Sequence, residues 1–226
     1  MPVAKNTPIS DKCMQRGSKG ERTREKILLA TIDLLAMHGI KGTTHRAIAT
    51  HADIQLSLTT YYFKDINELV QAAFQLNSEY IRAKTDSILD KASYILENTD
   101  KAALKKVSVK RGLCEQLSQM TANYLFTNIQ EETVNIAVEQ LMNTAVNVSP
   151  ELKKLAKEHE KSEIEPFTTL ASIFNKTDPE VDAQMMRTVF SQLQYNQLPL
   201  PPEERSIEPI QKVTRKLLGW IMGLKN

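Results

Sequence analysis

The stretch TTHRAIATHADIQLSLTTYYF, residues 43–63, decides the fold of this chain. A hydroxyl at Thr43 or Thr44 predicts a helix N-cap, and the alanines and isoleucine that follow give a short apolar helix face ending near Asp53. A second short helix is expected over residues 57–63, after a tight turn. Two short helices joined in this way are typical of a helix-turn-helix, whose second helix enters the major groove of DNA.

Longer helices are expected on both sides of this motif. Helical spacing of apolar residues predicts a helix from about Glu21 to His38. Gly39 follows at the position where a left-handed residue ends a helix. Downstream, Asp65 is expected to cap a longer helix. Residues 21–66 are therefore predicted to form a three-helix, helix-turn-helix DNA-binding domain.

The rest of the chain is also predicted to be helical. No proline occurs between Pro8 and Pro150, and Gly112 is the one glycine that interrupts the run from Thr43 to Leu218. The regular turn signals that separate short strands are missing from the sequence. The predicted fold class is therefore all-α, with the helix-turn-helix domain followed by a helical body.

Helix starts are clearest toward the C-terminus. Ser-Pro-Glu at 149–151 and Asp-Pro-Glu at 178–180 each place a capping residue before a proline and an acidic residue in the first turn. A last helix is expected from about Ser206, and Pro166 is expected to kink or break the helix that contains it. Apolar stripes also predict helices over Lys101–Met120 and Tyr124–Val148.

Charge is distributed unevenly along the chain. The 226 residues are 41% hydrophobic with a net charge of +2, which allows one large or two modest folded domains. Residues 1–63 carry nine basic and five acidic side chains, a net charge of +4, whereas residues 64–226 carry a net charge of −2. A basic N-terminal quarter joined to a mildly acidic body indicates that one end meets a polyanion.

Several classes of protein are excluded by composition. No apolar run approaches the roughly 18 to 20 residues that cross a bilayer, and the polar residues 1–20 lack the apolar region of a secretory signal. A cytoplasmic protein is therefore expected. Cys13 and Cys114 are too few for a disulfide framework. No metal or other cofactor is expected, because no partner at ligand spacing was identified for any of the four histidines, His38, His45, His51 and His159.

The second short helix carries side chains suited to reading DNA. Hydroxyls, an amide and aromatic edges can bond bases or phosphates without the desolvation cost of many charges. Each has a structural alternative: Thr43 can act as a helix cap, and Tyr62 can divide its ring and hydroxyl between core and contact. Ile48, Phe63 and Leu69 are expected in the core of the three-helix unit.

At these positions the sequence resembles the TetR family of transcriptional repressors. The resemblance covers about residues 22–75, and the chain departs from the usual family pattern at Ser57, Thr60 and Asp65-Ile66. The motifs that carry it are Thr23-Arg-Glu-Lys-Ile-Leu28, Gly39 to Gly42, Thr43-Thr-His-Arg-Ala-Ile-Ala49, and Tyr62-Phe63 with Glu68-Leu69.

The resemblance implies a regulator that binds double-stranded DNA, with a flexible basic arm over residues 1–20 and an effector-binding and dimerisation domain over residues 67–226. Such a repressor would bind a palindromic operator as a homodimer and release it when a small apolar or amphipathic effector binds. The DNA-contacting residues expected on this basis are Arg22, Arg24, Thr43, Thr44, His45, Arg46, Gln55, Ser57, Thr59, Thr60, Tyr61, Tyr62 and Lys64.

The body offers candidates for an effector pocket and for a dimer interface. Thioethers and aromatic rings fit irregular apolar ligands, although the same side chains also serve as ordinary core. The pocket candidates are Met120, Tyr124, Phe126, Met142, Phe167, Phe174 and Met186. The resemblance implies that the last two long helices, about 179–197 and 206–223, pair between subunits, although their apolar stripes would equally pack within one subunit. The interface candidates are Val189, Leu193, Val213, Leu217 and Ile221.

Two other functions compete with the regulator. An enzyme with an all-α cavity would need a nucleophile and base, a glycine-rich phosphate loop or a metal cluster, and the sequence shows none of these motifs. A helical adaptor would leave the basic arm and the helix-turn-helix unexplained. We therefore expect no enzymatic activity.

Overall fold

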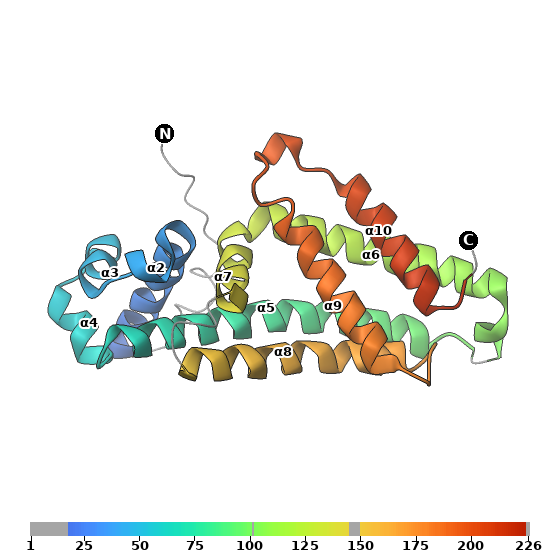
Figure 1. Cartoon of the computed structure of the whole chain (residues 1–226), viewed down its shortest axis with the longest axis horizontal. Helices are drawn as coiled ribbons and strands as arrows, with labels where there is room; N and C mark the ends of the chain where they lie inside the picture. The colour runs from blue at the N-terminus through green and yellow to red at the C-terminus, as the bar shows by residue number, and fades with distance from the viewer. Residues whose placement is uncertain (1–17, 101, 145–149, 225–226) are drawn as a thin grey trace. The chain divides into compact units, whose positions relative to one another are not determined.

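The computed structural model describes residues 18–100, 102–144 and 150–224, in which helices predominate and no strand occurs. The predicted all-α fold class is confirmed (Figure 1). The helices, labelled as in Figure 1, are α2 (Lys19–Gly42), α3 (His45–His51), α4 (Leu56–Tyr62), α5 (Ile66–Glu97), α6 (Val107–Glu131), α7 (Thr133–Thr144), α8 (Pro150–Ala171), α9 (Pro179–Tyr195) and α10 (Ile207–Ile221), with short 3₁₀ turns at Ala103–Lys105 and Pro202–Glu204.

The chain divides into two compact units. The first comprises the described residues within 1–81 and 131–157, and the second comprises those within 82–130 and 158–226. The predicted helix-turn-helix domain, residues 21–66, lies within the first unit, which also takes in the start of α5, all of α7 and the start of α8. Apolar side chains of these helices share its core.

The core of the first unit forms between α2 and the helices that surround it. Helix α7 packs directly against α2, and two of its side chains enter the same buried cluster as α2 and α5. Burial of such large aliphatic and aromatic side chains stabilises the unit by roughly 1.5–3 kcal/mol each. The cluster includes Ile27, Leu35, Ile48, Phe63, Leu69, Phe74, Val138 and Met142.

Local signals set the helix ends of the first unit. Ser18 and Glu21 form a reciprocal capping box at the start of α2. Gly39 has φ 64° and ends the regular part of this helix, as its position predicted. Thr44 is the N-cap of α3, where its hydroxyl accepts a hydrogen bond from the Ala47 amide, and Asp65 accepts two amide hydrogen bonds at the start of α5.

Two boundaries in the middle of the chain differ from expectation. We had expected the helix from Lys101 to end near Met120, but α6 is continuous from Val107 to Glu131. No glycine or proline interrupts its second half, and buried Ala122 and Leu125 continue its apolar stripe, so nothing stops the helix there. Helix α7 then supplies the rest of the predicted Tyr124–Val148 segment up to Thr144, and the later residues lie outside those described.

Of the two outcomes expected at Pro166, a kink or a break, the break does not occur, because α8 continues through this residue to Ala171. A proline inside a helix removes one backbone hydrogen bond and costs about 3 kcal/mol. Here the following turn is retained by packing, because Ala171 is buried and the Phe167 ring meets Phe190 edge-on at 6.0 Å. The start of α8 at Pro150 agrees with the sequence, although its expected cap Ser149 lies outside the described residues.

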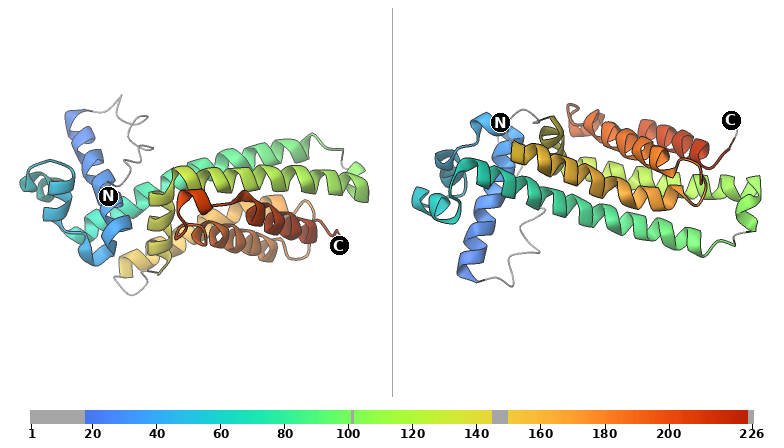
Figure 2. Two further views of the ribbon diagram at one scale, coloured as in Figure 1. Left: turned by 90° about the horizontal axis from the view of Figure 1, so that it is seen from above. Right: turned by 60° about the horizontal axis from the view of Figure 1, so that its bottom comes forward.

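The second unit contains α6, α9 and α10 together with the later parts of α5 and α8. Helices α9 and α10 lie side by side and run in opposite directions (Figure 2). The starts of both agree with the sequence signals at Pro179 and Ser206, and the Ser206 hydroxyl caps α10. Arg205 ties the connection to α6, because its Nη1 donates to the Ile129 carbonyl at 2.7 Å.

Candidate nucleic-acid interface

Helices α3 and α4 are held by the apolar residues on their inner faces. Ile48 and Ala49 of α3 are buried, and α3 packs against both α2 and α4 (Figure 1). Phe63, directly after α4, is also buried. The Arg24 guanidinium lies over its ring in a cation–π contact, 5.1 Å from the ring centroid. Because the inner faces are committed to the core, the outer faces of the two short helices are available to a partner.

Most of the predicted DNA-contacting residues are exposed, with Arg22 and Arg24 on α2 and the others on or beside α3 and α4. Tyr61 is 78% exposed, and its ring packs edge-on against the half-buried Tyr62 at 5.0 Å, which steadies it without covering it. The Thr60 hydroxyl donates to the Ser57 carbonyl, which leaves its oxygen free to accept a further hydrogen bond. The other exposed members of the set are Arg22, Arg24, Thr44, Arg46, Gln55, Ser57 and Lys64.

Two predicted contacts are corrected by the structure. Thr43 is 2% exposed and its Oγ1 donates to the Gly39 carbonyl at 2.8 Å, so its hydroxyl faces the end of α2. Thr59 is fully buried, donates to the Leu56 carbonyl at 2.8 Å, and meets Nδ1 of His45 at 3.1 Å. Both hydroxyls are buried and donate to backbone carbonyls inside the motif, so neither is exposed to a binding partner. His45 is half-buried and joins α3 to α4.

The surface around α4 combines cations with hydrogen-bonding and aromatic groups. Arg46 lies on α3 and Lys64 just after α4, on either side of the exposed α4 side chains in sequence. Cations neutralise phosphates and release counterions, whereas hydroxyls, amides and aromatic edges contact bases in the groove. Recognition of a duplex requires both kinds of group, cations for the phosphates and polar or aromatic side chains for the bases.

The predicted effector residues do not gather in one compact unit. Met142 lies in the core of the first unit and approaches the Ser78 hydroxyl at 3.9 Å, so it is part of that core. The other six lie in the second unit, where Met186 is buried and Tyr124 bonds the Thr85 hydroxyl at 3.1 Å. The remaining four, Met120, Phe126, Phe167 and Phe174, are half-buried.

The structure shows buried polar contacts that sequence analysis missed. In the first unit, Asn77 and Asn135 are buried and joined by two hydrogen bonds, and the Tyr80 hydroxyl donates to Glu132 at 2.8 Å. Each pair joins residues more than 50 positions apart, so no local pattern indicates it.

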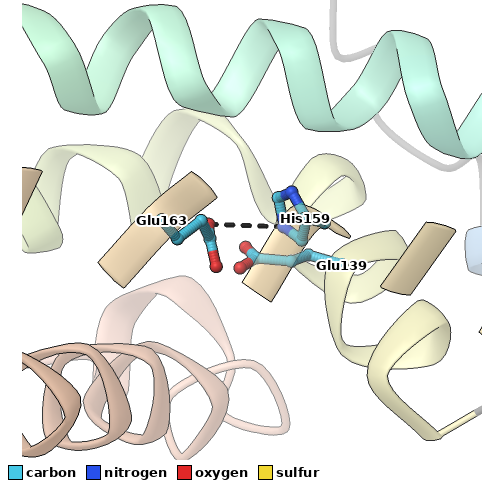
Figure 3. Close-up of side chains that lie close together, drawn as sticks. All are labelled: Glu139, His159 and Glu163. Atoms are coloured by element: carbon cyan, nitrogen blue, oxygen red, sulfur yellow. Dashed lines mark ion pairs between the residues drawn. The ribbon is translucent and has the colours of Figure 1, made fainter. Parts of the chain in front are cut away.

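One pairing was visible in the sequence and was overlooked. Contrary to our expectation that His159 has no partner at helical spacing, Glu163 lies one turn later on α8, and Nε2 of His159 is 3.3 Å from its carboxylate (Figure 3). Arg187 of α9 donates to the other carboxylate oxygen of Glu163 at 2.9 Å. The result is a largely buried ionic cluster between α8 and α9.

The expected dimer-interface residues divide by burial. Leu217 and Ile221 are 3% and 8% exposed and pack inside their own unit, so they are corrected from interface to core. Val189 and Leu193 are half-buried, and Val213 is exposed. Three further apolar side chains on the same two helices are also exposed, namely Val181, Met185 and Trp220.

Comparison with known proteins identifies the fold. A solved structure of a TetR-family member from Streptomyces coelicolor A3 aligns over 86% of this chain and 97% of its own, with 23% identity and a TM-score of 0.61. The fatty acid degradation regulator FadR from Bacillus halodurans aligns over 90% and 96%, with 18% identity and a TM-score of 0.63. The multidrug binding protein EbrR aligns over 90% and 96%, with 21% identity and a TM-score of 0.56.

This chain therefore has the fold of the TetR-family transcriptional regulators, as its N-terminal motifs suggested. The first two of these neighbours are described as a member of the TetR family and a fatty acid degradation regulator. No protein-family model and no curated protein matches the sequence. Of the helices in the described residues, none combines the length and apolar character needed to cross a bilayer.

Proposed function

We propose that this protein is a TetR-like repressor that binds a palindromic DNA operator through α3 and α4 and releases it when a small apolar or amphipathic effector binds. The observation that carries the proposal is that Thr60 and Tyr61 of α4 are exposed, as are the cations Arg46 of α3 and Lys64 just after α4. A protein with this role acts on DNA in the cytoplasm.

The proposed repressor works as a homodimer. One helix-turn-helix reads only a few base pairs, so a specific site needs two copies about 34–36 Å apart, in successive major grooves. The exposed apolar side chains on α9 and α10 support self-association through these helices, since burial of such residues between subunits removes them from water. We assign the interface to Val181 and Met185 of α9 and to Val213 and Trp220 of α10.

The proposed effector binds in the second unit. The half-buried aromatic and thioether side chains that this unit has on α6 and α8 suit an apolar ligand. The FadR and multidrug-binding neighbours are described as a fatty acid degradation regulator and a drug-binding protein, which supports an effector of this character. Release of DNA then requires only that the effector bind one arrangement of the dimer better than the other.

Salt-dependent binding to duplex DNA tests the proposal. Selection from random or genomic duplexes should return a palindromic site, and the logarithm of its affinity should fall linearly with the logarithm of salt concentration. Tyr61→Ala and Thr60→Ala should reduce discrimination between sites by about 1–3 kcal/mol per lost base contact. Arg46→Ala should weaken binding to every duplex. Lys91→Ala, on an exposed part of α5, is the control and should change neither.

The absence of salt-dependent binding to any duplex would overturn the proposal. Mass spectrometry of molecules that copurify with the protein would then identify what the second unit binds, and addition of such a molecule to the DNA complex tests release directly.

A further inference from the structure

A groove of about 880 Å³ runs between α6 and α10 in the second unit. None of the aromatic and thioether side chains proposed above for the effector lines it. The groove has four cationic side chains, two carboxylates and a short neutral floor formed by Cys114, Gly219 and Leu224. The charged side chains are Arg111, Lys212, Arg215, Lys216, Glu115 and Glu208.

Helical spacing brings the cations of α10 together. Lys212 lies three positions before Arg215 and four before Lys216, so these three cations share one face of the helix. This face is distinct from the one that buries Leu217 and Ile221 in the core. Arg111 projects into the groove from α6, so both walls contribute positive charge.

The charges in the groove are only partly compensated. Arg215 forms an ion pair with Glu115 at 3.1 Å, which joins the two walls. Lys216 lies over the Trp220 ring at 5.2 Å. Arg111 and Lys212 form no ion pair with any residue in the described part of the chain. From four cations and two carboxylates, the groove has a formal net charge of +2.

The floor of the groove is apolar and unreactive. A Cβ built on Gly219 would lie 3.8 Å from the Cys114 sulfur, so the two helices approach closely at this point. Burial raises the pKa of the Cys114 thiol, which keeps it protonated at neutral pH, and its sulfur lies 3.5 Å from the Arg215 carbonyl. A thiol in this state is a neutral surface for an apolar group and is a poor nucleophile.

We propose that the groove between α6 and α10 is a second ligand site, which binds a small organic dianion whose charged group meets Arg111 and Lys212 and whose apolar part rests on Cys114 and Leu224. The guanidinium of Arg111 offers the forked donor geometry that suits phosphate or carboxylate oxygens. The volume is of the size that small-molecule sites use, roughly 300–1,000 Å³. The proposal does not depend on DNA binding.

Calorimetric titration of the full chain with 1-naphthyl phosphate tests the assignment. This probe carries a phosphate dianion on an aromatic body, whereas 1-naphthol has only the body and inorganic phosphate only the charge. We expect saturable binding of one naphthyl phosphate per chain, with weaker binding of either fragment. The double variant Arg111→Gln, Lys212→Gln should lower the affinity for naphthyl phosphate by about tenfold or more, because charge-assisted hydrogen bonds are lost.

Two further variants distinguish binding in the groove from a general effect of the protein's net charge. Lys91→Gln with Lys161→Gln removes the same charge from exposed positions elsewhere in the second unit and should leave probe affinity unchanged. Gly219→Met fills the floor while keeping all four cations, and should also abolish binding in a protein whose circular dichroism shows it to be folded. Failure of the wild-type chain to bind the probe, equal weakening in the Lys91/Lys161 variant, or equal affinity for 1-naphthol would each overturn the proposal.

Discussion

Nδ1 of His45, the first residue of α3, lies 3.1 Å from Oγ1 of Thr59 in α4. The Thr59 hydroxyl donates its proton to the Leu56 carbonyl, so it accepts from His45, and the imidazole must carry a proton on Nδ1. This side-chain bond links α3 to α4.

Thr59→Val should therefore destabilise the protein. The valine keeps the shape of the buried side chain but leaves the His45 N–H without its acceptor, and we expect a loss of about 1–3 kcal/mol in unfolding free energy. Urea denaturation measures this loss. Thr60→Val, one residue away and exposed, is the matched control, and should leave stability within about 0.5 kcal/mol. Equal stability losses in both variants would contradict the assigned facing of α4.

Gly39 and Gly112 should respond in opposite ways to alanine. A Cβ would meet no atom within 4 Å at either position, so the backbone alone decides the outcome. Gly39 has φ 64° and ψ −175°, a conformation nearly restricted to glycine, and Gly39→Ala should cost about 1–3 kcal/mol. Gly112 lies inside regular α6, where Gly112→Ala should stabilise the protein by about 0.5–1 kcal/mol. Equilibrium unfolding of the two variants checks the sign.

The buried side-chain amides of Asn77 and Asn135 should contribute unequally to the free energy of unfolding. Asn77 both donates to the Asn135 carbonyl and accepts from the Asn135 amide, whereas the Asn135 side chain makes only the second of these bonds. Asn77→Ala should therefore destabilise the first unit more than Asn135→Ala, with each loss about 1–3 kcal/mol. A double-mutant cycle in urea measures the difference, and the reverse order would show that the amides are arranged differently.

Trp220 and Leu217 should separate assembly from folding. Trp220 is 55% exposed, so Trp220→Glu is expected to give a folded monomer with little operator affinity, because the glutamate would be buried in the proposed dimer interface. Leu217 is 3% exposed, and Leu217→Glu should instead unfold the second unit. Light scattering and circular dichroism on both variants check this. A Trp220→Glu protein that remains dimeric would place the interface elsewhere.

The sequence by itself determined the helical class and most helix starts. Capping hydroxyls, prolines at first helical positions and Gly39 act within one turn of the chain, so they can be read locally, and the structure places Thr44, Asp65, Pro179 and Ser206 accordingly. The basic, hydroxyl-rich helix-turn-helix was readable for the same reason. His159 and Glu163, four positions apart, were also within reach of a local reading.

Only the tertiary structure decided which side chains face outward and which helices belong together. Thr43 and Thr59 resemble their exposed neighbours Thr44 and Thr60 in type, but burial assigns them to the interior. The inclusion of α7 in the helix-turn-helix unit, the Asn77–Asn135 pair and the groove beside α10 all depend on contacts between distant segments. A short helix exposes several faces with similar residues, and the choice among them is made by the free energy of packing, which no local pattern contains.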